Sequence, residues 1–393
     1  MTSHRVTTYP RDAPSDYLHA LWQATLGRHH DAYSIPPSKF HQILNTDNAK
    51  VFVAYAGDPE QTPASQSPNS GRESDDRPSS SVARSQAGDS GSGDENQPHG
   101  APLGFAVAYL VKVTASTNPD TKVKGSLGAL VVSPDQQGKG IGSALHNAAV
   151  SYLEEEVRNS LPPNTDGTLQ LGSTFPRIFP GLPDIEYLQP AKDWFGKRGW
   201  RIGVPDAIDL YSPLPNDVNY DPFTSEARKH GVEFRHARPA DREALMRMEF
   251  TEFDSFTKGW PDMFPKMMSA GKYEDIILAV KGGTIIGATF AALPPCPLLD
   301  QLVWPSTLGK NCGSIACVGV AKAGRGTGAG VGMVAYAFRD LAEREADGVF
   351  IDWVSMKGFY ERFGAKQWEA KYCDGTRKVT PAPAQSASEE NAE

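Results

Sequence analysis

The sequence has few cysteines and no long apolar run. Four cysteines occur among 393 residues, between Cys296 and Cys373, and none forms a Cys-x-x-Cys pair. This spacing predicts reduced thiols, no metal site and no disulfide-stapled secreted scaffold. No stretch approaches the ~18 apolar residues that a membrane-spanning helix requires, and the polar N-terminus lacks an apolar signal core. These absences predict a cytoplasmic protein that does not engage a membrane.

The acidic charge is also unevenly distributed. The formal net charge is −8, but residues 58–100 carry eight acidic and only three basic side chains, and the last twenty residues add more acid. The rest of the chain is close to neutral, which argues against a nucleic-acid partner bound through phosphate contacts. We therefore expect a small-molecule partner, and the sequence holds no signal for an oligomeric state.

Two segments lack the residues that build a core. Residues 58–100 contain no aromatic side chain and one large aliphatic side chain, Val82, so they are predicted to be a disordered insertion. The apolar runs on either side, 51–57 and 103–111, predict adjacent strands, with the insertion as an enlarged loop between them. A second disordered segment is predicted over the tail, 374–393.

The sequence repeats itself. Residues 127–153, LGALVVSPDQQGKGIGSALHNAAVSYL, recur at 315–341 as IACVGVAKAGRGTGAGVGMVAYAFRDL, and 194–200 are echoed by 359–365. The repeat predicts two domains with the same order of elements, an N-terminal domain over 1–215 and a C-terminal domain over 232–373. A linker rich in turn residues is predicted between them at 216–231. Strands and helices alternate in each unit, which indicates the α/β class with a mixed sheet.

Each copy of the repeat contains a glycine loop between a strand and a helix. Glycines let the backbone turn tightly, and the N–H groups at the helix start then point at an anion. A plain tight turn is the alternative interpretation for either copy alone, and neither spacing fits a Rossmann fingerprint or a P-loop. The predicted loop residues are Gln137, Gly138, Lys139, Gly140 and Gly142 in the first copy, and Arg325, Gly326, Thr327, Gly328, Ala329 and Gly330 in the second.

Each half contains, in order, a strand, a (Q/R)xxGxG loop, a helix, a short strand and an aromatic pair followed by xxxG. This order resembles the GNAT superfamily of acyl-CoA-dependent N-acyltransferases. The resemblance covers both halves and implies two tandem GNAT-like domains, each a mixed, mostly antiparallel sheet flanked by helices. It implies acetyl-CoA as the cosubstrate, with the loop amides on its pyrophosphate and one strand amide polarising the thioester carbonyl. The strand residues implied to lie along the pantetheine arm are Leu130, Val132, Val318, Gly319 and Val320.

The two halves differ at the position that would supply a proton. Acetyl transfer to an amine needs a base for the ammonium and an acid for the leaving thiolate. The resemblance places the acid at Tyr360, whereas Phe195 stands at the equivalent position of the first half. We therefore expect catalysis in the second half, with Asp352 at the end of the fifth strand as the base. A helix N-cap or a salt-bridged carboxylate is the alternative for Asp352, and an ordinary core aromatic for Tyr360.

The segments IDWV (351–354), GFYERFG (358–364) and FPGLP (179–183) also resemble the glucosamine/glucosaminide group of tandem GNAT proteins. This resemblance implies direct transfer of an acetyl group to a primary amine of a small amino sugar such as glucosamine. A protein N-acetyltransferase, acting on lysine or N-terminal amines, and a non-catalytic CoA-binding sensor or scaffold are the alternatives. The long segment 293–313, which includes Trp304, is predicted either to cover the substrate pocket or to line the core.

Overall fold

The computed structural model describes residues 4–57, 100–114, 121–162, 165–214, 219–253 and 260–381. The predicted disordered insertion, apart from Gly100, and residues 382–393 of the predicted tail lie outside these ranges. None of the helices in the described ranges is long and apolar enough to cross a membrane.

The first half, up to Ser212, contains the predicted alternation of strands and helices. The runs 51–57 and 103–111 form paired antiparallel strands, as predicted. Its elements are β1 (His4–Thr8), α1 (Asp16–Trp22), the π-helix η1 (Gln23–Gly27), η2 (Asp31–Tyr33), α2 (Pro37–Leu44), β2 (Ala49–Ala56), β3 (Pro102–Thr114), β4 (Thr121–Val132), η3 (Pro134–Gln136), α3 (Ile141–Ser160), β5 (Gly167–Leu171), β6 (Leu182–Pro183), η4 (Glu186–Leu188), α4 (Gln189–Gly196) and β7 (Arg201–Ser212).

The second half repeats this plan. The segment that follows Tyr360 forms a single 3-10 turn, η8. The elements are α5 (Asp221–Lys229), β8 (Val232–His236), η5 (Pro239–Asp241), α6 (Arg242–Phe253), α7 (Trp260–Ser269), η6 (Tyr273–Asp275), β9 (Ile276–Lys281), β10 (Thr284–Ala292), α8 (Pro297–Asp300), α9 (Pro305–Leu308), β11 (Cys312–Val320), η7 (Lys322–Gly324), α10 (Ala329–Glu343), β12 (Gly348–Val354), η8 (Glu361–Phe363) and β13 (Lys366–Val379).

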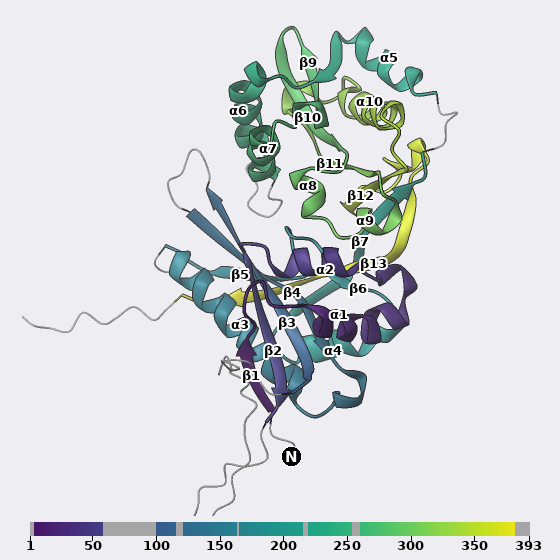
Figure 1. Ribbon diagram of the computed structural model, residues 1–393. Coiled ribbons are helices and arrows are strands. Elements are labelled where there is room, and N and C mark those ends of the chain that lie inside the picture. The colour runs from purple at the N-terminus through teal and green to yellow at the C-terminus, as the bar shows by residue number, and fades with distance from the viewer. Residues whose placement is uncertain are drawn as a thin grey trace, which may run out of the picture.

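The strands of both halves join in one sheet. Within the described ranges its order is β1-β2-β3-β4-β5-β13-β7-β12-β11-β10-β9-β8, with β6 paired to β13. Strand β13, the last in the chain, enters the first half and lies between β5 and β7. Strand β7 in turn lies between β13 and β12, so each half receives a strand from the other. In Figure 1, β13 is the long yellow strand that runs from the upper half into the lower one.

The exchange of β13 corrects the predicted start of the disordered tail. Residues Gly375–Val379 pair antiparallel with Leu171–Gly167 of β5, and Val379 is 1% exposed. The tail was predicted from a composition that lacks large apolar runs. However, the backbone groups of 374–379 find their hydrogen-bonding partners on a distant strand, and those partners hold the segment in the sheet.

The predicted linker, 216–231, also contains regular structure. Residues Asp221–Lys229 form helix α5, and Ala227 on its inner face is fully buried against α10. Pro222 lies in the first turn of α5, a position that suits proline at a helix start. The connection between the halves is therefore packed onto the second half.

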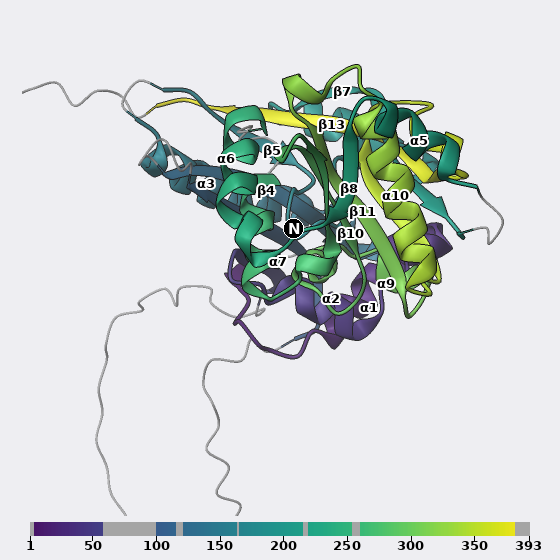
Figure 2. The same cartoon turned by 90° about the horizontal axis from the view of Figure 1, so that it is seen from above.

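The sheet of the second half is covered on both faces. In β9, Ile276 and Leu278 point into a core cluster with α6 and α7, while Ile277 and Ala279 join the cluster that contains α10. Successive side chains of a strand point to opposite faces, so both faces of β9 are buried. This explains why the strand reads as a continuous apolar run. Figure 2 shows the strands between α6 and α7 on one side and α10 on the other.

Helix α3 fixes the place of the first glycine loop. Ile141, Leu145, Ala149, Leu153 and Val157 follow one another at a spacing of four, and each is almost completely buried. Residues at this spacing share one face of a helix, so a continuous apolar stripe packs on the sheet. The stripe begins at the first helical residue and therefore anchors the start of α3 directly after the loop.

Candidate active site

In each half, two neighbouring parallel strands separate toward their carboxyl ends. Strands β4 and β5 pair only over Gly125–Leu127 and Leu169–Leu171, and β11 and β12 pair only over Cys312–Ser314 and Gly348–Phe350. Beyond these short ladders the strands diverge, and a register shift interrupts the pairing of β4 with β3 and of β11 with β10. The backbone groups of β4 and β11 that face the opening are thus left for a ligand.

The first glycine loop has the conformation that an anion site requires. Gly138 and Gly140 adopt φ values of 76° and 87°, the left-handed region that favours glycine, and Gly140 is the N-cap of α3. No side chain of the described residues caps the helix at this position. The first N–H groups of a helix lack intrahelical partners, so those of α3 remain as donors.

The second glycine loop repeats this backbone. Gly326 and Gly328 adopt φ values of 77° and 75°, and α10 begins after Gly328 without a side-chain cap from the described residues. The hydroxyl of Thr327 donates to the Gly324 carbonyl at 2.7 Å, which closes the turn before the helix. Both loops therefore have the predicted strand–loop–helix geometry, and the assignment of their residues to CoA binding stays a prediction.

A cavity of about 760 Å³ lies between the separated strands of the first half. Among the predicted cofactor residues, Leu130, Val132, Gln137, Gly138, Gly140 and Gly142 line it. Lys139 does not, because its ammonium group turns toward Gln136. The lining also includes the buried aromatic side chains of Trp22 and Phe179. The described residues that line the cavity include no carboxylate, imidazole, thiol or lysine, so they supply no base for an amine.

Arg198 is a cation of this cavity that the sequence interpretation missed. Its guanidinium lies 3.6 Å from the ring centroid of Trp194, and it donates to the hydroxyl of Ser143 at 2.6 Å. Ser143 belongs to the first turn of α3, so the guanidinium is fixed beside the helix start. Alignment of the two repeats could have singled out Arg198, because an apolar residue, Phe363, stands at the equivalent position of the second half. Arginine forks bind phosphate oxygens well, which suits this location.

Phe195 occupies a core position of the first half. It is 6% exposed and its ring packs on Trp194 and Trp200, in a core that also contains His146. Phe195 carries no hydroxyl, and Tyr187, which lines the outer part of the cavity, instead receives a hydrogen bond from the side chain of Gln137 at 3.2 Å.

In the second half, Asp352 forms an ion pair with Arg177. The pair joins Oδ2 of Asp352 to Nη1 of Arg177, and the two side chains are only 7% and 8% exposed. Of the alternatives for Asp352, the structure therefore shows the salt-bridged carboxylate. Its predicted role as the base is compatible with this ion pair and stays a prediction. The partner is unexpected, because Arg177 belongs to the first half, in the loop after β5.

Two further buried charges lie around this ion pair. Asp209 on β7 accepts a hydrogen bond from the backbone N–H of Trp353 at 2.8 Å, and burial raises its pKa to about 6. Lys124 on β4 donates to the hydroxyl of Thr174 at 2.9 Å, and burial together with nearby Arg177 lowers its pKa to about 8. Buried charges of both signs thus converge where the two halves meet.

Tyr360 is buried, with 7% of its surface exposed, and it belongs to the core cluster of the second half. Burial raises the pKa of its phenol, and the thiol of Cys317 on β11 raises it further. Cys317 sits at the register shift of β11 with a φ of 54° and is 6% exposed. The structure therefore brings Tyr360 within electrostatic range of the strand predicted to hold the thioester. Its role as the acid stays a prediction.

Strand β11, which is predicted to hold the cofactor in the second half, is covered by the end of α6. A Cβ atom added at Gly319 would lie 2.8 Å from the ring of Phe253, and the Glu252 carboxylate accepts the N–H of Lys322 at 3.0 Å. Glu249, one turn before Phe253 on the same face of α6, is fully buried, and burial raises its pKa to about 8. The sequence interpretation missed Glu249, and a carboxyl group on an otherwise apolar helix face is the signal that could have found it.

Trp304 lines the core and does not cover a pocket. It is 2% exposed, and its indole N–H donates to the carbonyl of Ile178 in the first half at 2.6 Å. The long segment 293–313 thus packs on the loop that carries Arg177. All four cysteines are buried and none forms a disulfide, and the described residues contain no cluster of histidine, cysteine or acidic side chains suited to a metal ion.

Comparison with protein families finds a match within the first half. Residues 66–165 match the acetyltransferase (GNAT) family. No curated protein matches the sequence significantly. A solved structure of a GCN5-related glucosamine N-acetyltransferase region of a fungal multi-domain GH3 β-N-acetylglucosaminidase is similar, with 26% identity and a TM-score of 0.74 over 96% of this chain. This chain spans 38% of the length of that protein.

Two further solved structures share the fold at lower identity. A GCN5-related N-acetyltransferase from Sphaerobacter thermophilus aligns with 14% identity and a TM-score of 0.59, over 96% of this chain and 97% of its own. A tandem GNAT protein from the clavulanic acid biosynthesis pathway aligns with 12% identity and a TM-score of 0.51, over 97% of this chain and all of its own. The predicted fold is thereby confirmed: the chain has the GNAT fold, with two GNAT-like units in tandem, and its residues 66–165 match the acetyltransferase (GNAT) family.

Proposed function

We propose that this chain transfers the acetyl group of acetyl-CoA to a primary amine of a small amino sugar, and that the second half performs the transfer. One observation carries the assignment to the second half. Asp352 lies at the end of β12, and Tyr360 lies within electrostatic range of Cys317, on the other strand of the opening between β11 and β12. The equivalent opening of the first half is lined by Phe195 and supplies no base.

The second glycine loop suits the diphosphate of the cosubstrate. The backbone is uncovered at Gly326, since a Cβ atom at that position would meet open space. The uncapped start of α10 adds N–H donors and the positive end of the helix dipole. Acetyl-CoA supplies the acetyl group as a thioester, whose carbonyl oxygen a backbone N–H of β11 would polarise.

Asp352 and Tyr360 move the two protons. An ammonium group does not attack a carbonyl carbon until it has lost a proton, and the carboxylate of Asp352 accepts that proton. The amine lone pair then forms the new C–N bond, the C–S bond breaks, and the phenol of Tyr360 gives its proton to the sulfur. The nitrogen, which carries an excess proton after the attack, returns one proton to the tyrosinate and becomes the neutral amide. Burial raises the pKa of Tyr360, so the phenol stays protonated at neutral pH and is available as the acid.

The choice of an amino sugar rests on similarity. The glucosamine N-acetyltransferase region aligns with 96% of this chain, which includes both halves and the strands they exchange. The proposal extends that region's acceptor to this chain. We also propose that the first half binds the same cosubstrate without turnover, because its loop and Arg198 can hold phosphates whereas its cavity lacks a base.

A thiol-release assay with acetyl-CoA and a panel of amines tests the proposal. We expect release with glucosamine and related amino sugars, and little release with lysine-containing peptides or free N-terminal amines. Release with peptides alone would favour a protein N-acetyltransferase. Binding of acetyl-CoA without release toward any amine would indicate a non-catalytic sensor or scaffold and would refute the proposed activity.

A further inference from the structure

We infer that Arg177, from the first half, is a positioning residue for the second-half site, where it holds the carboxylate of Asp352 ionised and fixed in orientation. This inference rests on the proposed function, in which Asp352 is the base. It implies that the catalytic centre of the second half is complete only when the first half is present.

The ion pair is buried and specific in its atoms. Nη1 of Arg177 contacts Oδ2 of Asp352, and both side chains are less than one tenth exposed. A carboxylate removed from water stays charged only when an opposite charge compensates for the lost solvation. Because Arg177 engages Oδ2, the second oxygen, Oδ1, is the one left to accept a proton from the acceptor ammonium.

Arg177 is held by its backbone and by two aromatic rings. Its N–H donates to the carbonyl of Gln301 at 2.7 Å, and its own carbonyl accepts the N–H of Val303 at 3.2 Å. The guanidinium carbon lies 4.9 Å from the ring centroids of both Phe175 and Trp353. A guanidinium sandwiched in this way has little freedom to rotate, so it can fix the direction of the carboxylate.

The other charged or titratable groups facing Arg177 come from three strands. They are Asp209 on β7, Cys317 on β11 and Lys124 on β4. Burial lowers the pKa of Arg177 to about 10, which still leaves it a cation at neutral pH. Asp209 is engaged by the N–H of Trp353, and Lys124 by Thr174. Arg177 is a cation in direct contact with the carboxylate of Asp352.

Removal of the cation should affect proton transfer more than binding. Without Arg177, the ionised form of Asp352 loses its compensating charge, and its protonated form becomes relatively more stable. A protonated Asp352 cannot accept the ammonium proton. The low-pH limb of the kcat profile should therefore move toward neutral pH, while affinity for acetyl-CoA, which depends on the glycine loop, should change little.

The experiment compares Arg177→Met, Arg177→Lys and Asp352→Asn with the wild type in the full-length chain. The matched control is Lys39→Met. Lys39 is another buried cation of the first half, and it donates to the carbonyls of Leu299 and Asp300 in the second half at 2.9 Å each, away from Asp352. Steady-state kinetics across pH, with the best acceptor of the amine panel, give kcat and the KM for acetyl-CoA. A double-mutant cycle of Arg177→Met and Asp352→Asn, followed by urea unfolding, measures the coupling free energy between the two side chains without an activity assay.

We expect Arg177→Met to lower kcat by about 100-fold or more and to raise the low-pH limb by about one pH unit or more, with the KM for acetyl-CoA changed less than about twofold. Arg177→Lys should restore the limb and much of kcat, because it keeps the cation. Lys39→Met should leave the limb unchanged. The unfolding cycle should show that the effects of the two substitutions are coupled.

A folded Arg177→Met protein with the wild-type limb, alongside an inactive Asp352→Asn protein, would overturn the positioning role and leave the proposed function standing. Equal shifts of the low-pH limb in Arg177→Met and Lys39→Met would overturn the positioning role as well, because a general weakening of the contacts between the two halves would explain both shifts. Full activity of Asp352→Asn would instead refute the base assignment, and the role of Arg177 would fall with it. If the wild type acetylates no amine, the proposed function is refuted. Independently of activity, additive effects of the two substitutions on the free energy of unfolding would refute the interaction between Arg177 and Asp352.

Discussion

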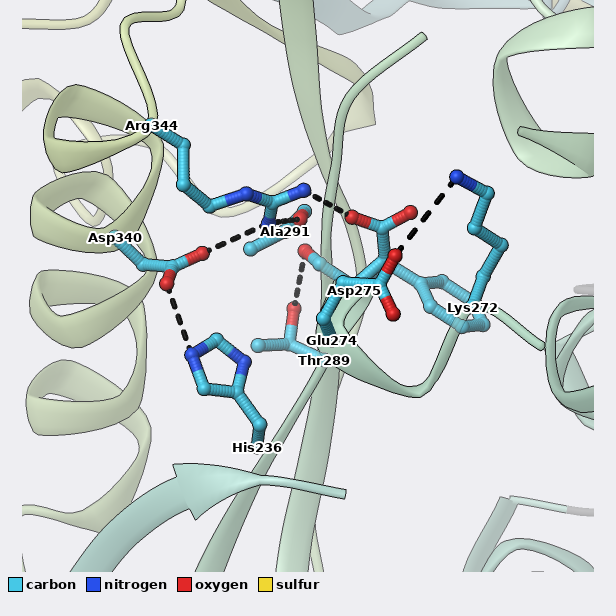
Figure 3. A network of polar contacts seen from close by, with 9 residues as sticks. His236, Lys272, Glu274, Asp275, Thr289, Ala291, Asp340 and Arg344 are labelled. Atoms are coloured by element: carbon cyan, nitrogen blue, oxygen red, sulfur yellow. Dashed lines mark hydrogen bonds and ion pairs between the residues drawn. The ribbon is translucent and has the colours of Figure 1, made fainter. Parts of the chain in front are cut away.

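Nε2 of His236 lies 3.0 Å from Oδ1 of Asp340, and this contact joins strand β8 to helix α10 (Figure 3). The other oxygen of Asp340 contacts Arg344 at 3.0 Å, and Arg344 also reaches Asp275 before β9 at 2.5 Å. Side chains of alternating charge thus connect strand β8, helix α10 and the turn η6 in the second half. Burial raises the pKa of Asp275, and Arg344 opposes that effect.

This network predicts a pH-dependent contribution to stability. The hydrogen bond to Asp340 raises the pKa of His236, so the contact stabilises the fold fully below the unfolded histidine pKa of about 6.5 and loses that effect as pH rises through the raised value. We expect the melting temperature of the wild type to fall more between about pH 6 and pH 8.5 than that of His236→Gln. The difference should be small, because the imidazole is partly exposed. Parallel melting curves for the two proteins would contradict this assignment.

The two glycine loops predict different effects of the same substitution. Gly328→Val should abolish acetyl transfer and CoA binding in the second half, whereas Gly140→Val should remove binding in the first half and leave transfer largely intact. Valine is strained at positive φ by about 1–2 kcal/mol and would block the approach of a phosphate. Calorimetry with CoA and the transfer assay measure both effects. Gly271→Val is the control, because Gly271 has the same φ of 75° with open space around it, outside both loops.

Tyr360→Phe tests the acid. We expect kcat to fall by about 10²–10⁴-fold with little change in the KM for acetyl-CoA, because only the proton donor is lost. Tyr220→Phe is a matched control, since Tyr220 is a buried tyrosine of the same core cluster. Steady-state kinetics decide the result, and an unchanged kcat for Tyr360→Phe would show that another group protonates the thiolate.

Truncation tests the strand exchange. A chain that ends at Cys373 loses the residues that pair β13 with β5, including the buried Val379, whose burial alone is worth about 1.5–3 kcal/mol. A chain that ends at Pro381 keeps them all. We expect the shorter chain to unfold at clearly lower urea concentration and the longer one to match the full-length protein. Equal stability of both truncated chains would refute a structural role for residues 374–379.

Local patterns predicted most of the elements and the two loops correctly. The alternation and apolar runs of β9, β10 and β11 predicted strands, and the spacing of Leu145, Ala149 and Leu153 is that of a helix face. The glycines of each loop predicted the left-handed turns, because few other residues adopt them. These features depend on interactions between neighbours in the chain, so a single sequence with an internal repeat was sufficient to find them.

The sequence by itself thus determined that two units of one plan follow each other, where their loops lie, and that only the second keeps a tyrosine at the position of Phe195. The tertiary structure alone decided that β7 and β13 are exchanged, that Arg177 of one half reaches Asp352 of the other, and that Arg198 lies beside the start of α3. The reason is physical. Strand pairing and the compensation of a buried charge depend on which segments, distant in the chain, come into contact. The local periodicity of the sequence does not specify those contacts.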